Sequence, residues 1–524
     1  MTVTQRWTMV GTVLGSAIIF LDGTIVNVAL KVLGEQLPAT IVGVLEGQTY
    51  VVSGYLATLA ALLILAGALG DYYGRRRVFA IGLAGFGTTS VMCGLAPNLE
   101  LLALFRVLQG ATGALLVPGS LSIITATFEG PARARAFGIW AAATSATTAV
   151  GPLVGGYLVD AVSWRAAFLL NAPLVILALY ATLTKMNESR DEQASGRFDW
   201  LGAFVGVVAV GGLALGGIRG QDRQWQDPLA FVALGVGAVA LVAFPILMAV
   251  RPDPLVPLSL FRKRAFAVIN MSTLLIYGAL YVTFGFQGLF LQGTLGYTAF
   301  GAGATGLPVS ILLTVLSTRV GTLAGRFGPR LFLVAGPLIM AAGLLWLARI
   351  PPSSEPWLAN PSVPSTLVPP ASVLVDVLPS IVLFGIGISL VVAPLTSTLM
   401  DSVPVRYAGL GSAINNAVSR VGQPLLSAVV FIVLSQTFYG DLVRLVPGLP
   451  VHSPEIRRQL TPLNRPPNQL PQEVRVAARI ASTDSFHFAV LVGAGLLVAG
   501  AAVNGVGLRP GRQPREADDP PRTA

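Results

Sequence analysis

Long runs of apolar residues, separated by short polar segments, dominate the chain. A helix that crosses a bilayer needs about 20 mainly apolar residues, and fourteen runs approach or exceed that length. We predict membrane-spanning helices over residues 8–30, 45–69, 78–97, 99–122, 136–159, 166–184, 199–218, 228–250, 266–290, 302–325, 330–350, 374–398, 408–434 and 485–508. The pattern therefore predicts an all-α polytopic membrane protein.

The composition supports this interpretation and excludes other classes. Of the 524 residues, 54% are hydrophobic and 11% are charged, whereas a soluble globular chain carries about 25% charged residues. So few charges cannot cover a water-facing surface of this size. The single cysteine, Cys93, excludes an internal disulfide. Basic loops that orient helices account for the net charge of +10, so we expect no nucleic-acid partner.

The basic residues predict the orientation of the spans. If the N-terminus is cytoplasmic, most Lys and Arg residues fall in cytoplasmic loops, as the positive-inside rule requires, and both termini are cytoplasmic. We divide the chain into an N-terminal six-helix half (1–184), an inserted helix pair with its linkers (185–264), a C-terminal six-helix half (265–508) and a disordered cytoplasmic tail (509–524). The C-terminal half includes a long outside loop, residues 435–484, which is partly amphipathic, for instance at Glu473–Ile480, and which we expect to be structured or semi-ordered.

Two loops have similar sequences. The segment from Gly67 to Arg76, after the second span, and the segment from Gly321 to Arg330, after the tenth, match at Gly, Leu, Gly and Arg positions. Parallel repeats are typical of secondary transporters whose substrate site lies between the two halves. Chance recurrence of a Gly/Arg turn is the alternative. The second copy lacks the acid of the first, Asp71.

The sequence contains no recognisable motif for ATP hydrolysis or metal catalysis. None of its lysines lies in a P-loop, and its two histidines and one cysteine show no spacing typical of metal ligands. We therefore expect a protein that is not an enzyme, that uses no ATP, metal or cofactor, and that draws its energy from a gradient. One proton that crosses 100 mV provides about 2.3 kcal/mol.

Several motifs together resemble the major facilitator superfamily and, more narrowly, its fourteen-span drug:proton antiporters. The motifs are LDGTIVNVAL (21–30), GALGDYYGRRR (67–77), RVLQG (106–110) and GPLVGG (151–156). The chain departs from the pattern at Lys31, Tyr50 and Tyr72. The resemblance covers nearly the whole chain. It implies the major facilitator fold, with two six-helix halves plus two inserted helices.

The resemblance also implies a function, namely proton-coupled secondary active export of drugs or other amphipathic small molecules by alternating access. The expected partners are the transported molecule, protons and the lipid bilayer, for a monomer in the cell membrane. The alternative is a porter dedicated to one endogenous solute, such as a metabolite, a siderophore or a lipid. A channel, a sensor or a membrane-embedded enzyme is less favoured, because the repeat points to a carrier and no catalytic cluster is present.

Two charged residues inside apolar spans are the candidates for proton coupling. A bare carboxylate at Asp22 is costly, so we expect it to be protonated, paired or facing water. Arg106 lies at a similar depth in the fourth span, and its guanidinium stays charged and needs a partner. We hypothesise that Arg106 modulates the protonation of Asp22 as the halves rock. The alternatives are a structural carboxyl at Asp22 and an ion pair that only holds helices together.

A loop at a cytoplasmic helix end is a candidate for conformational control. Asp71 and Arg75 have the i,i+4 spacing that permits an ion pair on a helix, and Arg76 follows directly. The resemblance implies that this loop latches the cytoplasmic side when the outer side is open. A role in topology signalling alone is the alternative.

The fifth predicted span is the second candidate for conformational control. It carries Gly151, Pro152, Gly155 and Gly156. Small residues let a partner helix approach closely, and a proline frees a backbone carbonyl. The resemblance implies a hinge and a seal near the interface of the halves, and plain close packing is the alternative.

Polar and aromatic residues within spans are the candidates for substrate contact, namely Asn27, Tyr55, Tyr277, Tyr281, Phe284, Gln287, Asn415, Asn416 and Arg420. Most aromatic residues in spans serve packing or anchor a helix at the membrane interface. Three roles stay open for Arg420: contact with an anionic group, an ion pair with Asp401, or extension of its side chain towards water.

Overall fold

The computed structural model describes residues 1–38, 44–190, 198–222, 227–360 and 363–509, and most of them are helical. The first eight helices are α1 (Val3–Gln36), α2 (Val44–Tyr73), α3 (Arg75–Gly94), α4 (Leu99–Gly113), α5 (Leu116–Thr127), α6 (Gly130–Ala161), α7 (Trp164–Leu169) and α8 (Asn171–Lys185). Three helices follow: α9 (Trp200–Asp222), α10 (Pro228–Val250) and the short α11 (Ser259–Arg262).

The remaining helices include several short turns. They are α12 (Arg264–Leu289), η1 (Phe290–Leu295), α13 (Ala299–Ala304), α14 (Leu307–Phe327), α15 (Pro329–Leu347), η2 (Pro364–Leu367), η3 (Val373–Val377), α16 (Leu378–Ser402), η4 (Val405–Tyr407), α17 (Ala408–Leu445), α18 (Pro454–Gln459) and α19 (Gln472–Gly507). The described residues contain no strand. The predicted all-α class is therefore confirmed.

The lengths of the helices fit a membrane protein. In the described part of the chain, 12 helices are long and apolar enough to cross a membrane, and each coincides with a predicted span. The other two predicted spans, 136–159 and 408–434, fall within α6 and α17, helices of 32 and 38 residues. A total of fourteen spans stays a prediction. Of the predicted tail, residues 510–524 lie outside the described residues.

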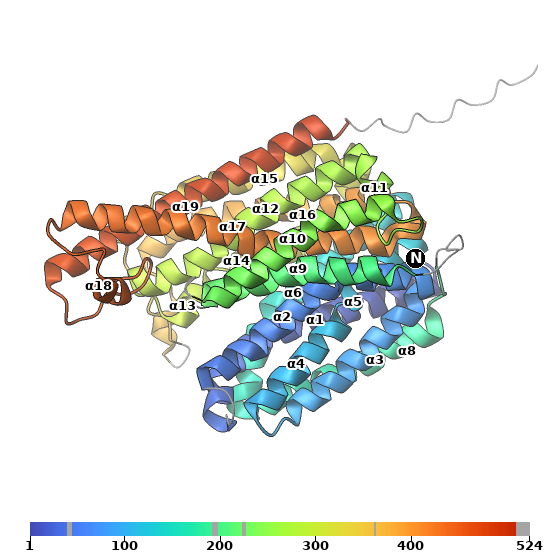
Figure 1. Ribbon diagram of the computed structural model, residues 1–524, viewed down its shortest axis with the longest axis horizontal. Coiled ribbons are helices and arrows are strands. Elements are labelled where there is room, and N and C mark those ends of the chain that lie inside the picture. The colour runs from blue at the N-terminus through green and yellow to red at the C-terminus, as the bar shows by residue number, and fades with distance from the viewer. Residues whose placement is uncertain (39–43, 191–197, 223–226, 361–362, 510–524) are drawn as a thin grey trace, which may run out of the picture.

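The helices form two groups (Figure 1), which meet mainly along two helix pairs. α1 to α8 pack mainly on one another, as do α12 to α19, whereas α6 packs on α14 and α17 packs on α2 across the two groups. α9 and α10 pack on each other, and α9 also contacts α2 and α17. The inserted pair therefore covers one of the two contact lines. Large exposed apolar side chains on α10, such as Phe231, Val239 and Ile246, suit a lipid-facing surface.

The two similar loops of the sequence have matching backbones. Gly74 separates α2 from α3 with φ +112°, and Gly328 separates α14 from α15 with φ +84°, values that favour glycine. Gly67 of the first copy abuts Gly409 of α17, and its counterpart Gly321 abuts α6. The same position of the repeat thus lies on each contact line between the groups.

The segment predicted as an outside loop, residues 435–484, is largely helical. α17 continues to Leu445 and α19 begins at Gln472, so both helices project together beyond the bundle towards α18 (Figure 1). The projection has a small apolar core of its own, which includes Phe438, Leu442, Leu460, Val474, Ala477 and Ala481. The helical parts suit the partly amphipathic sequence of this segment, because an amphipathic helix outside the bilayer keeps polar residues on its outer face; its position outside the membrane stays a prediction.

Candidate functional site

The two candidates for proton coupling, Asp22 and Arg106, form a buried ion pair between α1 and α4. Arg106 Nη1 donates to Asp22 Oδ2 at 2.5 Å, and each side chain is 1% exposed. Taking two charges out of water costs several kcal/mol per ion. Such a pair is therefore stable only where further polar groups bind both ions.

Polar groups from three helices surround this pair. Asp22 Oδ1 accepts hydrogen bonds from Gln109 Nε2 at 3.1 Å and from Asn171 Nδ2 at 3.2 Å. Arg106 Nε donates to the backbone carbonyl of Val51 at 3.0 Å, and Arg106 Nη1 also donates to Gln109 Oε1 at 2.7 Å. Three side-chain donors from α4 and α8 therefore hold the carboxylate in place of water.

Tyr55 of α2 lies against the guanidinium of this pair. Arg106 Cζ is 3.9 Å from the centroid of the Tyr55 ring, which is well within the range of cation–π attraction. The Tyr55 side chain is 2% exposed, and its hydroxyl has no hydrogen-bond partner among the described residues. Tyr55 is thus the predicted substrate residue that the structure places at the ion pair.

The glycines of the fifth predicted span pack on α1 beside Asp22. A Cβ atom at Gly151 would collide with Thr24 Oγ1, and one at Gly155 would lie 3.1 Å from Ile25 Cα. α6 therefore approaches α1 within one turn of the buried carboxylate. Because interiors are close-packed, a shift of α1 at this level must displace α6 as well.

Asp71 and Arg75 connect the two groups of helices at the end of the bundle that holds the N-terminus. They form a buried ion pair of 2.9 Å. The Asp71 carboxylate also accepts hydrogen bonds from the backbone N–H groups of Gly409 and Leu410, at 3.0 and 2.8 Å, where the positive end of the α17 dipole favours an acid. Arg75 donates to the carbonyl of Val405. One acid and one base thus hold α2 and α3 to the start of α17.

The other contact line has a different link. Arg133 of α6 pairs with Asp401 of α16 at 2.9 Å, and the Asp401 side chain is 62% exposed. Gly325 occupies the position in the second loop that corresponds to Asp71 in the first. The links at the two contact lines therefore differ. Because Asp401 pairs with Arg133, it is not the ion-pair partner that the sequence suggested for Arg420.

Arg76 binds within its own group of helices. Its Nε and Nη2 donate to the carbonyls of Thr182 and Leu183 at 3.1 and 2.5 Å, and its backbone N–H donates to Glu188 Oε1 at 3.0 Å. Adjacent helical residues point about 100° apart, so Arg76 faces α8 while Arg75 faces α17. In this conformation Arg75 thus contacts the other half, whereas Arg76 contacts α8 of its own half.

The two asparagines predicted to contact substrate bind other helical groups in this conformation. Asn415 Nδ2 donates to Asn270 Oδ1 at 3.2 Å and to Thr273 Oγ1 at 2.7 Å. Asn416 Nδ2 donates to the carbonyl of Ser412, in its own helix, at 3.0 Å. Asn415 therefore ties α17 to α12, and both amides have partners without a ligand.

The remaining predicted contacts lie along α12. The Tyr277 and Tyr281 rings are 6.3 Å apart, Phe284 packs edge-on against Phe384 at 5.2 Å, and Gln287 is 4% exposed. Three other predicted residues have side chains outside the described part of the structure: Asn27, Pro152 and Gly156. Within the described residues, no group of three or more His, Cys, Asp and Glu side chains is placed to hold a metal ion.

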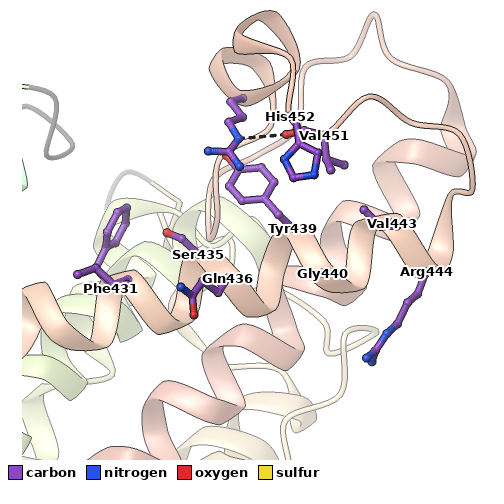
Figure 2. A pocket seen from close by; sticks show the side chains of 11 residues that line it. Phe431, Ser435, Gln436, Tyr439, Gly440, Val443, Arg444, Val451 and His452 are labelled. Carbon is purple, nitrogen blue, oxygen red and sulfur yellow. Dashed lines mark hydrogen bonds between the residues drawn. The ribbon is translucent and has the colours of Figure 1, made fainter.

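A separate pocket lies in the projection formed by α17 and its neighbours (Figure 2). It encloses about 660 Å³, and Gln436, Tyr439, His452 and Arg457 are among the residues that line it. Tyr439 Oη donates to a backbone carbonyl at 3.0 Å, and the Arg457 guanidinium lies 4.8 Å from the Tyr439 ring. Tyr439 lies about 28 Å beyond Arg420 along α17. None of the residues that line this pocket belongs to the site around the ion pair.

The chain as a whole matches known membrane transporters. A model of the Major Facilitator Superfamily matches residues 12–427. The chain belongs to the Major Facilitator Superfamily. The multidrug resistance protein Stp of Mycobacterium tuberculosis (strain CDC 1551) is 35% identical over 449 residues, which cover 85% of this chain and 79% of that protein. The tetracenomycin C resistance and export protein of Streptomyces glaucescens is 31% identical over 440 residues, which cover 83% and 77%.

The fold of this Major Facilitator Superfamily member also matches solved structures. The crystal structure of the human organic anion transporter MFSD10 aligns with a TM-score of 0.59 at 12% identity, over 95% of this chain and 99% of that chain. The family model and the relatives confirm the resemblance to the superfamily that the motifs predicted. The chain is a multi-pass membrane transporter and not an enzyme.

Two residues of the site received no role from the sequence. Gln109 follows Arg106 by three positions, a spacing that places both on one helix face, so helical geometry offered a signal for it. Asn171 reaches Asp22 from α8, and no spacing along the chain indicates that contact. In this Major Facilitator Superfamily member, the polar surroundings of the acid therefore depend on tertiary packing.

Proposed function

We propose that this transporter exports drugs and other amphipathic small molecules in exchange for protons. The observation that carries the proposal is the Asp22 carboxylate, which is buried inside a membrane-spanning helix and is paired with Arg106 at 2.5 Å. An ionisable residue inside a membrane helix marks a functional site by default. Two relatives, a multidrug resistance protein and a tetracenomycin C resistance and export protein, support export of such compounds.

Protonation of Asp22 links the proton to movement of the helices. The proton neutralises the carboxylate, and Arg106 then lacks its counter-charge in a medium of low dielectric constant. Because the two residues lie on α1 and α4, loss of their attraction lets these helices move apart. α1 transmits the shift to α6 where Gly151 packs on Thr24. Release of the proton restores the ion pair and the starting arrangement.

Access to the site alternates as the two halves rock about their contact lines. In this conformation, Asp71 and Arg133 both bind residues of the opposite half at the end that holds the N-terminus. We place that end in the cytoplasm, so that the site is closed to the cytoplasm here. The proposal includes fourteen spans, both termini in the cytoplasm, a monomer in the cell membrane, and a proton gradient in place of any cofactor.

Expression in a drug-sensitive bacterial host tests the proposal. The wild-type protein should raise tolerance to several unrelated compounds, and a protonophore should abolish export of a fluorescent substrate. Asp22→Asn should remove tolerance at equal protein level. Asp227→Asn is the matched control, because Asp227, directly before α10, pairs with Arg219 of α9 at 2.5 Å, so that it removes an Asp–Arg pair of the inserted helices.

Two results would count against this function. Export that persists in Asp22→Asn would remove the acid from the mechanism, and export insensitive to the protonophore would exclude proton exchange. Tolerance to a single compound would instead indicate a porter dedicated to one solute.

A further inference from the structure

Arg420 is a charged residue in the middle of α17. It lies about 18 Å along the helix from Ala408, where α17 begins, and thus near the centre of a hydrocarbon layer about 30 Å thick. Among the residues that the structure describes, none forms a hydrogen bond or an ion pair with its side chain. Asp401 pairs with Arg133 instead. A guanidinium stays charged even here, so Arg420 needs a negative partner.

The packing of α17 on α2 shows which way Arg420 faces. Gly409 and Ala413 both lie against Gly67 of α2, and Ala417 continues this row one turn later. Arg420 follows Ala413 by seven residues, which is two turns of helix, so it shares the same face. The Arg420 side chain therefore projects towards the contact between the two halves rather than towards lipid.

The register of the two helices places Arg420 near Tyr55. α2 and α17 run antiparallel, and Ala417 lies in one apolar cluster with Ala60. One further turn along α17 reaches Arg420, and about one further turn back along α2 reaches Tyr55. The electrostatics agree with this placement, because the charges of Asp22, Arg106 and Arg420 all act on the Tyr55 hydroxyl.

Among the residues that the structure describes, this region has one positive charge in excess. Arg106 is neutralised by Asp22, whereas Arg420 is not neutralised by any described residue. The buried Tyr55 hydroxyl is a second donor without a partner. Two unsatisfied donors, one from each half, are well suited to one negatively charged group. Because the Asp22 charge is already balanced by Arg106, that carboxylate repels such a group only weakly.

We propose that Arg420 and Tyr55 form a subsite for an anionic group on the exported molecule. This inference rests on the proposed export function and narrows its substrates to apolar molecules that carry a carboxylate, a sulfonate or a phenolate. An anion bound there contacts both halves at once, so its arrival can influence how they close. The Arg420 guanidinium supplies the charge, and the Tyr55 hydroxyl supplies a second hydrogen bond.

A matched pair of fluorescent probes tests the subsite. Anilinonaphthalene sulfonate and phenylnaphthylamine share one ring system, and the first carries a permanent negative charge. Their binding to the full-length protein is measured in lipid nanodiscs, with protein-free nanodiscs subtracted. Arg420→Gln should weaken binding of the sulfonate about ten- to hundredfold, the range expected for a hydrogen bond to a charged group, and should affect the uncharged amine much less.

Further variants separate an anion subsite from a general loss of structure. Arg420→Lys should retain part of the affinity for the sulfonate, because Lys keeps the charge but lacks the planar fork. Tyr55→Phe should weaken sulfonate binding by a smaller factor than Arg420→Gln. Arg319→Gln is the control, since it removes an exposed arginine from a span of the same half, and it should leave both affinities unchanged.

The subsite proposal is wrong if Arg420→Gln binds the sulfonate and the uncharged amine with the same ratio of affinities as the wild-type protein. An equal weakening of both probes also gives this ratio and would therefore overturn the proposal. A different result would contradict the export proposal. If Asp22→Asn leaves export intact, the export proposal is wrong. If Asp22→Asn abolishes export but Arg420→Gln keeps the preference for the sulfonate, only the anion subsite is wrong.

Discussion

Replacement of Asp71 by Asn should loosen the contact between α2 and α17. The Asp71 carboxylate accepts two hydrogen bonds from the first N–H groups of α17, at 3.0 and 2.8 Å, and pairs with Arg75 at 2.9 Å. Asn has nearly the same size and keeps one acceptor. It loses the negative charge, however, and turns an N–H donor towards groups that are donors themselves.

The expected magnitude follows from these contacts. A hydrogen bond to a charged group contributes about 1.5–3 kcal/mol, and two such bonds cross between the halves. Because Asn retains one acceptor, we expect a loss of about 3 kcal/mol for the closed arrangement. At about 1.4 kcal/mol per factor of ten, this corresponds to roughly a hundredfold shift of the equilibrium towards opening at this end.

Electron–electron distance measurements between two spin labels report the opening directly. Suitable positions are Arg77 and Val405, which are exposed on opposite sides of the contact. The native Cys93 is buried, so it should not compete for the label. The doubly labelled wild type should show mainly the short distance of the closed contact. Asp71→Asn should add a population at longer distance.

The Asp227→Asn variant controls for the loss of an Asp–Arg pair elsewhere and should keep the wild-type distribution. An Asp71→Asn protein that is folded but shows the wild-type distribution would refute the argument that this acid holds the halves together.

Three further substitutions test the packing and the second link. Gly151→Ala should lower thermal stability and export rate because its Cβ would collide with Thr24, and Thr24→Ala in the same protein should restore part of both; no restoration would contradict the proposed contact. Gly67→Ala should favour opening in the distance assay, since overpacking costs about 1–3 kcal/mol. Asp401→Asn should shift the same distances far less than Asp71→Asn, because a largely exposed ion pair contributes about 0–1 kcal/mol.

The apolar pattern predicted the membrane helices because a chain surrounded by lipid can adopt few backbone structures. Inside a bilayer every backbone polar group must be satisfied within the span, so an apolar run of sufficient length becomes a helix. Outside the bilayer this constraint disappears. α17 therefore continues to Leu445 and α19 begins as early as Gln472, beyond the ends of the predicted spans 408–434 and 485–508.

Part of the site was also predictable from the cost of placing polar groups in lipid. Charges inside apolar spans are costly and therefore conspicuous, which singled out Asp22 and Arg106. Their positions along the helices predicted a similar depth, but depth does not determine which way a side chain points within the membrane plane. The contact between them, the donation from Asn171 and the different directions of Arg75 and Arg76 all depend on how the helices are rotated against their neighbours.

Substrate-dependent proton movement tests the central claim most directly. The purified protein is reconstituted into sealed vesicles that contain a pH-sensitive dye, and an exported compound is added with no other energy source. The wild-type protein should move protons in the direction opposite to the compound, and Asp22→Asn should move none while it still binds the compound. Equal proton movement by the wild-type protein and Asp22→Asn would contradict the account.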